Sequence, residues 1–225
     1  MNKQLTELAY ILDRSGSMAS MVEPAISGFN QFLAEQRKAP GHARLSLILF
    51  DDEYLVPCQS LPIEEVTELD TTTYVPRACT ALLDAIGRTI VELGKRLAAT
   101  PEAERPGQVI IAIFTDGLEN ASTDFDFRKI SKLIKQQREK YNWQFLFLAA
   151  NQDAIGTAAQ MGIDQNFAAN VQFSHGGVRS SSRSFSRKMQ AMRHHAATGE
   201  KLADYDAPMQ DIVGEEEKKD EDGES

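Results

Sequence analysis

The sequence contains few of the side chains that usually bind transition metals or crosslink small domains. Among its 225 residues, two are cysteine and four are histidine. Two cysteines are too few for a disulfide framework or a zinc site, and no histidine stands at metal-binding spacing from a cysteine or an acid. No apolar run approaches the roughly 18 residues needed to cross a membrane. Because the N-terminal stretch also lacks the apolar core of a signal peptide, we expect a cytoplasmic protein with no membrane segment.

An excess of basic residues is also absent. The formal net charge is −9. Residues 200–225 contain eleven acids and three lysines, a net of −8, which leaves about −1 for residues 1–199. The acidity therefore belongs to the C-terminal stretch, and the rest of the chain is nearly neutral. Without a broad basic surface, nothing in the sequence indicates binding to nucleic acid.

Motifs of common enzyme classes are missing. The chain has neither a phosphate-binding Gly-x-x-x-x-Gly-Lys-Ser/Thr loop nor a dinucleotide fingerprint. The stretch Asp13-Arg14-Ser15-Gly16-Ser17 lacks the Gly-x-Ser-x-Gly turn of serine hydrolases. A two-aspartate phosphatase would need an acid at position 15, and a serine nucleophile would need a nearby general base, which no histidine after a strand supplies. We therefore expect a protein that is not an enzyme, with a metal-dependent hydrolase or phosphatase as the alternative.

Apolar runs of strand length alternate with helical patterns along the first 173 residues. Runs without polar alternation are typical of strands that are covered on both faces, as in a parallel sheet. Alternating strands and helices predict an α/β fold with right-handed crossovers. The predicted strands are 5–12, 45–50, a hairpin edge strand at 54–61, 109–114, 145–150 and 167–173. The predicted helices begin near residues 22, 82, 127 and 153, and the last ends at Gly162 as a C-cap.

The composition changes after Ser174. Residues 174–199 are rich in serine, glycine and arginine, and we interpret them as a mobile linker that includes a short helix over 185–192. Residues 200–225 have little apolar surface to bury, which predicts a disordered acidic tail. The expected organisation is therefore one domain over 1–173, a linker over 174–199 and a tail over 200–225.

Polar side chains follow the predicted strands where a parallel sheet binds its ligands, beyond the carboxyl ends of the strands. Asp13, Ser15 and Ser17 follow the first strand, Asp116 follows the strand at 109–114, and Thr80 precedes the second helix. Carboxylate and hydroxyl oxygens without imidazole or thiolate favour a hard cation such as Mg²⁺ or Mn²⁺. Because two acids barely neutralise such an ion, the site would accept a further anionic ligand. Taken singly, either serine would be interpreted first as a cap of the helix that follows.

These residues resemble a known family. The pattern Asp13-x-Ser15-x-Ser17, the later Thr80 and Asp116-Gly117 after an apolar strand are similar to the von Willebrand factor type A domain and its metal-ion-dependent adhesion site (MIDAS). The resemblance covers roughly residues 5–173. It implies a Rossmann-like three-layer α/β/α fold with a mainly parallel sheet of about six strands and one antiparallel edge strand. It also implies that Asp13, Ser15, Ser17, Thr80 and Asp116 are the metal ligands.

The resemblance implies a function in binding rather than catalysis. In this family an open coordination position on the ion takes an Asp or Glu carboxylate from a partner protein. The local stretches resemble bacterial or phage stand-alone members. This chain departs from the family at Cys79, because many members have a glycine or serine before the threonine. We expect a metal-dependent protein-binding adaptor that is a monomer outside its complex. A subunit of a chelatase-, stress-response- or phage-associated complex is the alternative. Glu119 and Asn120 are candidates for contacts at the rim of the site, and Asp84 is interpreted as structural.

Overall fold

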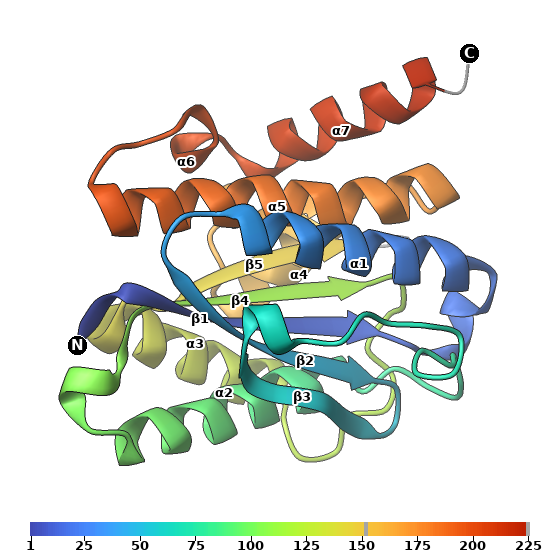
Figure 1. The fold of residues 1–225 in the computed structure, drawn as a ribbon. Coiled ribbons are helices and arrows are strands. Elements are labelled where there is room, and N and C mark those ends of the chain that lie inside the picture. The colour runs from blue at the N-terminus through green and yellow to red at the C-terminus, as the bar shows by residue number, and fades with distance from the viewer. Residues whose placement is uncertain (151–152, 224–225) are drawn as a thin grey trace.

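A six-stranded sheet lies between two layers of helices in the computed structural model, which describes residues 1–150 and 153–223 (Figure 1). The strand order is β3-β2-β1-β4-β5-β6. β3 pairs antiparallel with β2, and the other neighbours pair in parallel. The strands are β1 (Asn2–Asp13), β2 (His42–Phe50), β3 (Tyr54–Pro62), β4 (Pro106–Thr115), β5 (Gln144–Ala149) and β6 (Ala168–Asn170). This arrangement confirms the predicted fold class, including the antiparallel edge strand.

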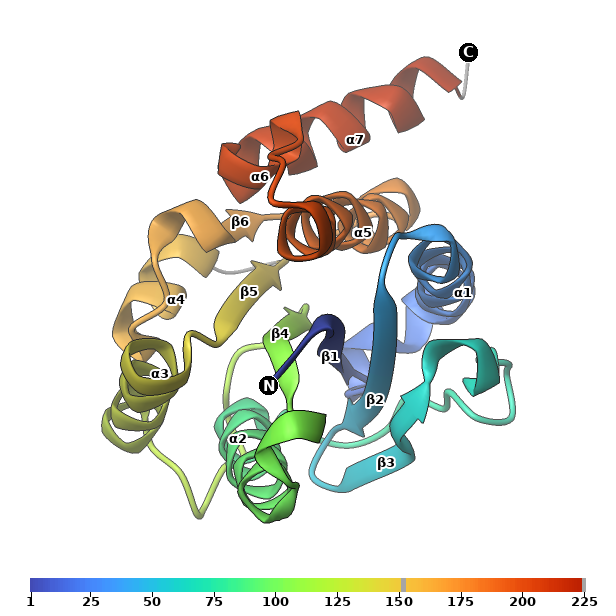
Figure 2. The ribbon, with the colours of Figure 1, turned by 60° about the vertical axis from the view of Figure 1, so that its left-hand side comes forward.

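The helices cover both faces of the sheet, as Figures 1 and 2 show. α1 and α5 pack on one face with α7 outside them, and α2, α3 and α4 pack on the other. The helices are α1 (Val22–Lys38), α2 (Leu82–Ala99), α3 (Phe127–Tyr141), α4 (Ala154–Met161), α5 (His175–Thr198), α6 (Ala203–Asp206) and α7 (Met209–Gly223). Within the described residues, no helix combines the length and the apolar character required to span a bilayer.

The apolar runs of the sequence are explained by this layering. In β1, Leu8 and Tyr10 pack on the side of α1 and α5, whereas Ala9 and Ile11 pack on the side of α2 and α3. Successive residues of a strand point to opposite faces, so a strand covered on both sides is apolar at every position. α4 ends as predicted at Gly162, which adopts the left-handed conformation with φ of 78°.

The C-terminal segment differs from the sequence prediction. The predicted linker at 174–199 is one long buried helix, α5, rather than a mobile segment with a helix over 185–192. α5 begins at Ser174, whose side chain accepts a hydrogen bond from the N–H of Gly177 at 3.0 Å, and ends at Gly199 with φ of 80°. The domain therefore extends well beyond residue 173, because α5 forms half of one helical layer.

Small side chains allow α5 to approach α1 closely. Ser182 lies so near Gly28 that a Cβ added at Gly28 would be 2.8 Å from the Ser182 hydroxyl. That hydroxyl also lies 3.0 Å from the hydroxyl of Tyr10. Phe185 completes an aromatic cluster, because its ring meets the Tyr10 ring edge-on at 5.6 Å, and Tyr10 packs edge-on against Phe29 as well. The serines that suggested a linker are therefore packing residues.

Two buried cations on α5 are held by backbone carbonyl groups. Arg193 is 2% exposed and donates to the carbonyl oxygens of Gln36 at 2.7 Å and Gly41 at 3.1 Å, among others beyond the end of α1. Lys188 is also 2% exposed, and its Nζ donates to three carbonyls, those of Asp204, Tyr205 and Ala207. The negative end of a helix dipole favours a cation, which explains the position of Arg193 after α1.

The predicted disordered tail is also helical over most of its length, although residues 224 and 225 lie outside the described part of the chain. α7 buries three apolar side chains at helical spacing, Met209, Ile212 and Val213. Its acids pair with arginines of α5, for example Glu216 with Arg183 at 2.9 Å. The further ion pairs between α5 and residues 204–220 are Arg183–Asp220, Arg187–Asp204, Arg187–Glu215 and Arg187–Glu216. The opposite charges of the two segments therefore form one interface.

Candidate metal centre

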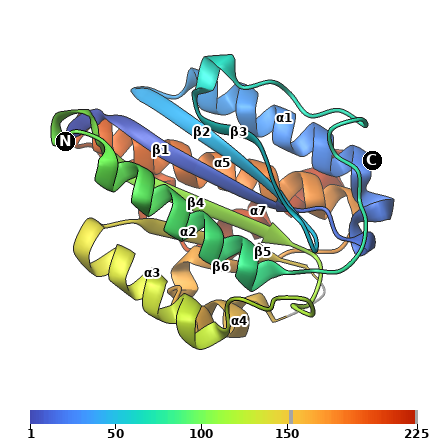
Figure 3. The ribbon, with the colours of Figure 1, turned by 90° about the horizontal axis from the view of Figure 1, so that it is seen from below.

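The five predicted ligands lie at one edge of the sheet. β1 and β4 are adjacent and parallel, so their carboxyl ends present Asp13 and Asp116 side by side. Ser15 and Ser17 belong to the turn after β1, and Thr80 precedes the first turn of α2. The loops that carry them meet at the same end of the molecule in Figure 3. The topology thus brings together segments that are about 100 residues apart in sequence, since Ser17 and Asp116 differ by 99 positions.

Hydrogen bonds connect four of these residues. Asp13 accepts the N–H of Ser15 through Oδ1 at 2.6 Å. The hydroxyls of Ser15 and Ser17 are 3.0 Å apart, and Ser17 donates to Asp116 Oδ1 at 2.8 Å. Asp13, Ser15 and Asp116 are buried, whereas Ser17 is exposed. The hydroxyl and carboxylate oxygens therefore converge at a point that is open to solvent on the side of Ser17.

Thr80 joins the same cluster through its position next to Gly117. A Cβ added at Gly117 would lie 2.7 Å from Thr80 Oγ1 and 3.5 Å from Ser17 Oγ. Both hydroxyls therefore lie against the Gly117 backbone, and only a residue without a side chain fits there. This explains why glycine follows Asp116 in the sequence.

The donor set suits a divalent cation. All five side chains offer oxygen, the ligand that magnesium and manganese prefer. Within the described residues, Oδ2 of Asp116 is buried and has no hydrogen-bond partner, a costly state for a carboxylate oxygen unless another group binds it. The described residues contain no cluster of three or more His, Cys, Asp or Glu side chains that could hold a metal. A metal at this edge would therefore depend on hydroxyl oxygens, as the sequence predicted.

Two buried hydroxyl groups, which sequence reasoning did not assign to the site, hold Asp13 in place. Thr115, the last residue of β4, donates its hydroxyl to Asp13 Oδ2. Tyr74 is fully buried, and its hydroxyl donates to the backbone carbonyl of Asp13. Thr115 could have been found from its place directly before Asp116. Tyr74 could not, because it lies in residues 66–81, which contain neither helix nor strand.

The residues after Asp116 organise the Thr80 loop. Asn120 accepts the Thr80 N–H through Oδ1 at 2.9 Å, and its own N–H donates to the Thr80 carbonyl at 3.1 Å. Glu119 accepts the N–H of Leu83 at 2.8 Å at the start of α2. Asp84 accepts backbone N–H groups from residues 123–125, which agrees with its predicted structural role. Asn120 and Glu119 thus position the loops rather than simply lining the rim.

A buried ion-pair network connects the other two loops of the site. Asp51 is fully buried, and its Oδ2 lies 3.0 Å from Arg14 Nη2 and 3.2 Å from Arg77 Nε. Its backbone carbonyl accepts the N–H of Ala81. Arg77 N–H in turn donates to the carbonyl of Arg14 at 2.9 Å. Asp51, at the end of β2, therefore ties the turn that carries the two serines to the loop that carries Thr80.

Comparison with solved structures identifies the fold of the chain, whereas comparison of sequences does not. Neither a family model nor a curated protein sequence matches the chain. Among solved structures, the vWF domain of the type V pili tip protein Mfa5 from Porphyromonas gingivalis matches with a TM-score of 0.55 at 10% identity, over 82% of this chain and 94% of that chain. The chain has the von Willebrand factor type A fold.

Two further structures with this von Willebrand factor A fold contain metal ions. Proximal thread matrix protein 1 from the mussel byssus, with a zinc-occupied MIDAS motif, matches with a TM-score of 0.56 at 13% identity over 82% of this chain. Manganese-loaded TRAP protein from Plasmodium vivax matches with a TM-score of 0.52 at 15% identity, over 80% of this chain and 72% of that chain. The chain spans 46% of the length of the mussel protein, less than half.

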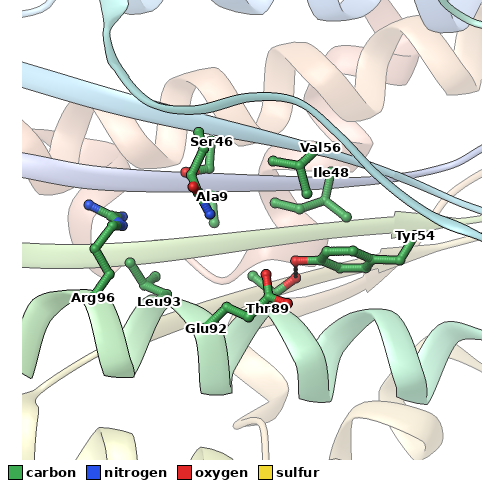
Figure 4. A pocket seen from close by; sticks show the side chains of 10 residues that line it. Ala9, Ser46, Ile48, Tyr54, Val56, Thr89, Glu92, Leu93 and Arg96 are labelled. Atoms are coloured by element: carbon green, nitrogen blue, oxygen red, sulfur yellow. Dashed lines mark hydrogen bonds between the residues drawn. The ribbon is translucent and has the colours of Figure 1, made fainter.

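A cavity between α2 and the sheet, apart from the candidate metal centre, is too small to bind a ligand. It lies between α2 and strands β2 and β3, and its volume is about 20 Å³, enough for about one water molecule. Figure 4 shows the hydroxyl of Tyr54 directed at Thr89, 3.1 Å away, with Glu92 and Arg96 further along α2. The polar groups around this cavity already have partners, because Glu92 pairs with Arg88 and Arg96 with Glu7.

The raised pKa of Asp13 should make the stability of the metal-free protein depend on pH. Burial raises the pKa of Asp13 to about 6, although hydrogen bonds from Thr115 and Ser15 act in the opposite direction. Because the folded protein holds this proton more tightly than the unfolded chain, the free energy of unfolding falls as pH rises from about 4 through 6. We expect Asp13→Asn to stabilise the chelator-treated protein at pH 8 by roughly 1–3 kcal/mol, and to give no gain below pH 4.

Urea unfolding at several pH values, with chelator present throughout, measures this effect. Asp211→Asn on the exposed face of α7 is the matched control and should change the unfolding midpoint little at any pH. An equal response of the two variants to pH would contradict the assignment to Asp13.

Removal of the Asn120 side chain should weaken metal binding without unfolding the protein. Asn120 is exposed, and its side chain accepts the Thr80 N–H, a hydrogen bond that alanine would remove while the bond from the Asn120 backbone N–H stays. Partners that orient a ligand typically contribute about 10–100-fold to metal affinity. We therefore expect Asn120→Ala to raise the dissociation constant for Mn²⁺ by about tenfold in calorimetry. Asn166 is exposed and precedes β6, at the amino end of that strand and away from the candidate ligands. Asn166→Ala should therefore leave the dissociation constant unchanged.

Proposed function

We propose that the chain is a divalent-metal-dependent protein-binding module that captures a carboxylate of a partner protein. The observation that carries the proposal is the cluster at the sheet edge, in which Ser15, Ser17 and Asp116 are joined by hydrogen bonds while Asp116 Oδ2 has no partner in the part of the chain that the structure describes. Asp13, Ser15, Ser17, Thr80 and Asp116 would hold the ion. Its two acids only just balance the charge of a divalent cation and fill few of its coordination positions, which leaves room for an Asp or Glu from outside.

We propose magnesium or manganese as the ion, because every donor is an oxygen. The zinc and manganese in the mussel and Plasmodium structures show that the fold accepts more than one divalent metal. When bound, the cation supplies an open coordination position for the partner's carboxylate. The residues of this chain hold the loops: Tyr74 and Thr115 fix Asp13, and Asn120 fixes Thr80.

A binding function, rather than catalysis, is part of this proposal. Among the described residues, the hydroxyls of Ser15 and Ser17 bond to each other and to Asp116, with no imidazole or amine as a partner. His175 is the histidine on this side, and its Nε2 lies 3.2 Å from the carbonyl of Ser20, not near a serine hydroxyl. This supports an arrangement built for ligand capture, since a nucleophile needs a neighbouring base.

A selection from displayed random peptides tests the proposal. The immobilised full chain is presented with the library in Mg²⁺ or Mn²⁺, and in parallel with chelator. We expect peptides that contain Asp or Glu to be enriched only with metal, and to lose binding to Asp13→Ala. Enrichment that is the same in chelator, or that persists in Asp13→Ala, would show that the chain binds through another surface.

A further inference from the structure

A surface groove runs from the metal end of the sheet along α2. Its volume is about 750 Å³. The outward side of α2 forms its floor, the turn between β2 and β3 forms one wall, and residues 121–125 form the other. Ala81, the neighbour of Thr80, lines one end, and Lys95 lines the other. The groove therefore begins one residue from Thr80, although none of the five candidate ligands lines it.

The dimensions suit an extended peptide. Asp84 and Lys95 are eleven positions apart on α2, which corresponds to about 16 Å at a rise of 1.5 Å per residue. An extended chain rises about 3.3 Å per residue, so roughly five residues of a partner span this distance. A carboxylate bound at the metal centre would place the residues that flank it at the Ala81 end of the groove.

The groove carries more carboxylates than cations. Its acids are Asp52, Glu53, Asp84, Glu92 and Asp124, and its bases are Arg88 and Lys95. Some of these charges are already compensated. Arg88 pairs with Glu92 at 2.8 Å, and Arg77 beside the groove lies 2.8 Å from Glu53 and 3.6 Å from Asp52.

At the wall formed by residues 121–125, two carboxylates form no ion pair within the described residues; Lys129 donates its Nζ to the backbone carbonyl of Asp124 at 2.7 Å and not to its carboxylate. Asp84 is half-buried and accepts backbone N–H groups of Thr123, Asp124 and Phe125, none of which is a cation. Asp124 is exposed, and the ion pairs of the described residues include neither Asp84 nor Asp124. Two carboxylates thus face the groove about one helical turn from its metal end.

The groove also offers surfaces for the apolar stem of a long basic side chain. Phe125 is half-buried and Leu55 is 39% exposed, and they lie on opposite walls. The Tyr54 ring already carries a guanidinium, because Arg88 lies 4.4 Å from its centroid. Lysine and arginine bury their stems on apolar surface while the charge stays in water, which is what these walls allow.

We propose that this groove binds the partner segment that flanks the metal-bound acid, and that it selects a lysine or arginine two or three residues from that acid. The inference rests on the proposed function, because the metal-bound carboxylate sets the register. Two or three extended residues advance about 7–10 Å, whereas Asp84 lies about 4.5 Å of helix rise beyond Ala81, so a base at this spacing can reach past the Ala81 end of the groove to Asp84. The partner is therefore a protein with an acid and a base in one extended stretch.

The peptides selected with metal provide the test. We expect their sequences to carry Lys or Arg at the second or third position from the shared acid, on one side of it. Synthetic versions with that base replaced by glutamine should bind about two- to fivefold more weakly, the range of an exposed ion pair. The difference should shrink as salt is raised, because exposed charges are screened.

Charge reversal on the chain itself makes the test specific. Asp124→Lys changes an exposed side chain outside the metal-binding residues and should weaken the basic peptides while leaving Mn²⁺ affinity unchanged. Glu139→Lys, with the same charge change near the end of α3 at the opposite edge of the sheet, should not weaken them.

The two failures are distinguishable. Metal-dependent peptides that share an acid but show no preference for a base, or that bind Asp124→Lys as tightly as wild type, would overturn the groove inference and leave the proposed function standing. If no peptide depends on metal, although calorimetry shows metal binding, both the proposed function and the groove inference are wrong.

Discussion

Replacement of Asp13 by alanine is expected to abolish saturable binding of Mg²⁺ and Mn²⁺. Asp13 supplies one of only two carboxylates in the candidate site, and it also accepts the hydrogen bonds that shape the serine turn and join it to β4. Loss of a residue that merely orients a ligand costs about 10–100-fold in metal affinity. Loss of a charged ligand should exceed this, so we expect the dissociation constant to rise by more than about 100-fold.

Calorimetric titration of the chelator-stripped protein measures the effect. The wild type should show one saturable site, and Asp116→Ala should behave like Asp13→Ala. Asp211→Ala on α7 removes an acid of the same type far from the site and should bind metal like the wild type. Circular dichroism of each variant separates loss of metal from loss of fold. A variant Asp13→Ala that retains the wild-type affinity would show that the ion binds elsewhere.

Among the substitutions considered, replacement of Arg193 by methionine should cause the largest decrease in the free energy of unfolding. Its guanidinium satisfies carbonyl oxygens of Gln36, Ala39, Pro40 and Gly41, so the variant leaves several buried acceptors without donors. Burial lowers the pKa of Arg193 to about 10, which shows that holding this charge has a cost of its own. Because removal of a donor from buried partners costs about 1–3 kcal/mol for each group left unsatisfied, the loss should outweigh that gain. We expect a decrease of about 3 kcal/mol in the free energy of unfolding.

Denaturant unfolding of Arg193→Met against wild type gives this value. Lys201→Met is the control, because it removes an exposed cation close to the end of α5 and should change stability by less than about 0.5 kcal/mol. An unchanged midpoint for Arg193→Met would mean that water replaces the guanidinium and that α5 is held mainly by its apolar contacts.

The sequence predicted the sheet well because its strands are buried on both faces. Continuous apolar runs such as residues 109–114 leave little ambiguity in a chain where they alternate with helices. The hairpin with β3 was predicted from the short turn after Phe50, and α4 from its glycine cap. The last strand was predicted too long, since β6 ends at Asn170. Beyond it an α7 side chain replaces a neighbouring strand, because Glu217 accepts the N–H of Gln172 at 2.8 Å.

The C-terminal helices were missed for a physical reason. Serines at the contact with α1 look polar in the sequence, but they allow close packing and donate to carbonyls of their own helix, as Ser184 does to Ser180. The arginines of α5 find acids about 20–40 residues later, and such pairing cannot be inferred from composition. Local signals were nevertheless present, because Ser174 and Gly199 are a typical start and stop of a helix.

The candidate site also has a part that the sequence predicted and a part that it did not. Its five predicted ligands follow strands or begin a helix, so the topology alone places them together. The residues that hold them, such as Tyr74 and Asn120, belong to irregular segments whose path depends on the folded whole. A pattern in the sequence therefore predicted which side chains meet at the candidate site, whereas the support around them required the structure.

The place of α5 has a consequence for folding during synthesis. Phe185 closes the aromatic cluster around Tyr10, so the face of β1 and α1 that it covers stays exposed to water until about residue 198 has left the ribosome. At 5–20 residues per second, the 25 residues from Ser174 to Thr198 take roughly 1–5 s. During this interval a growing chain that already contains all five candidate ligands still presents an open apolar face. Chaperones that recognise apolar surface should therefore bind the nascent chain late, after the metal-site loops have emerged and before α5 is complete.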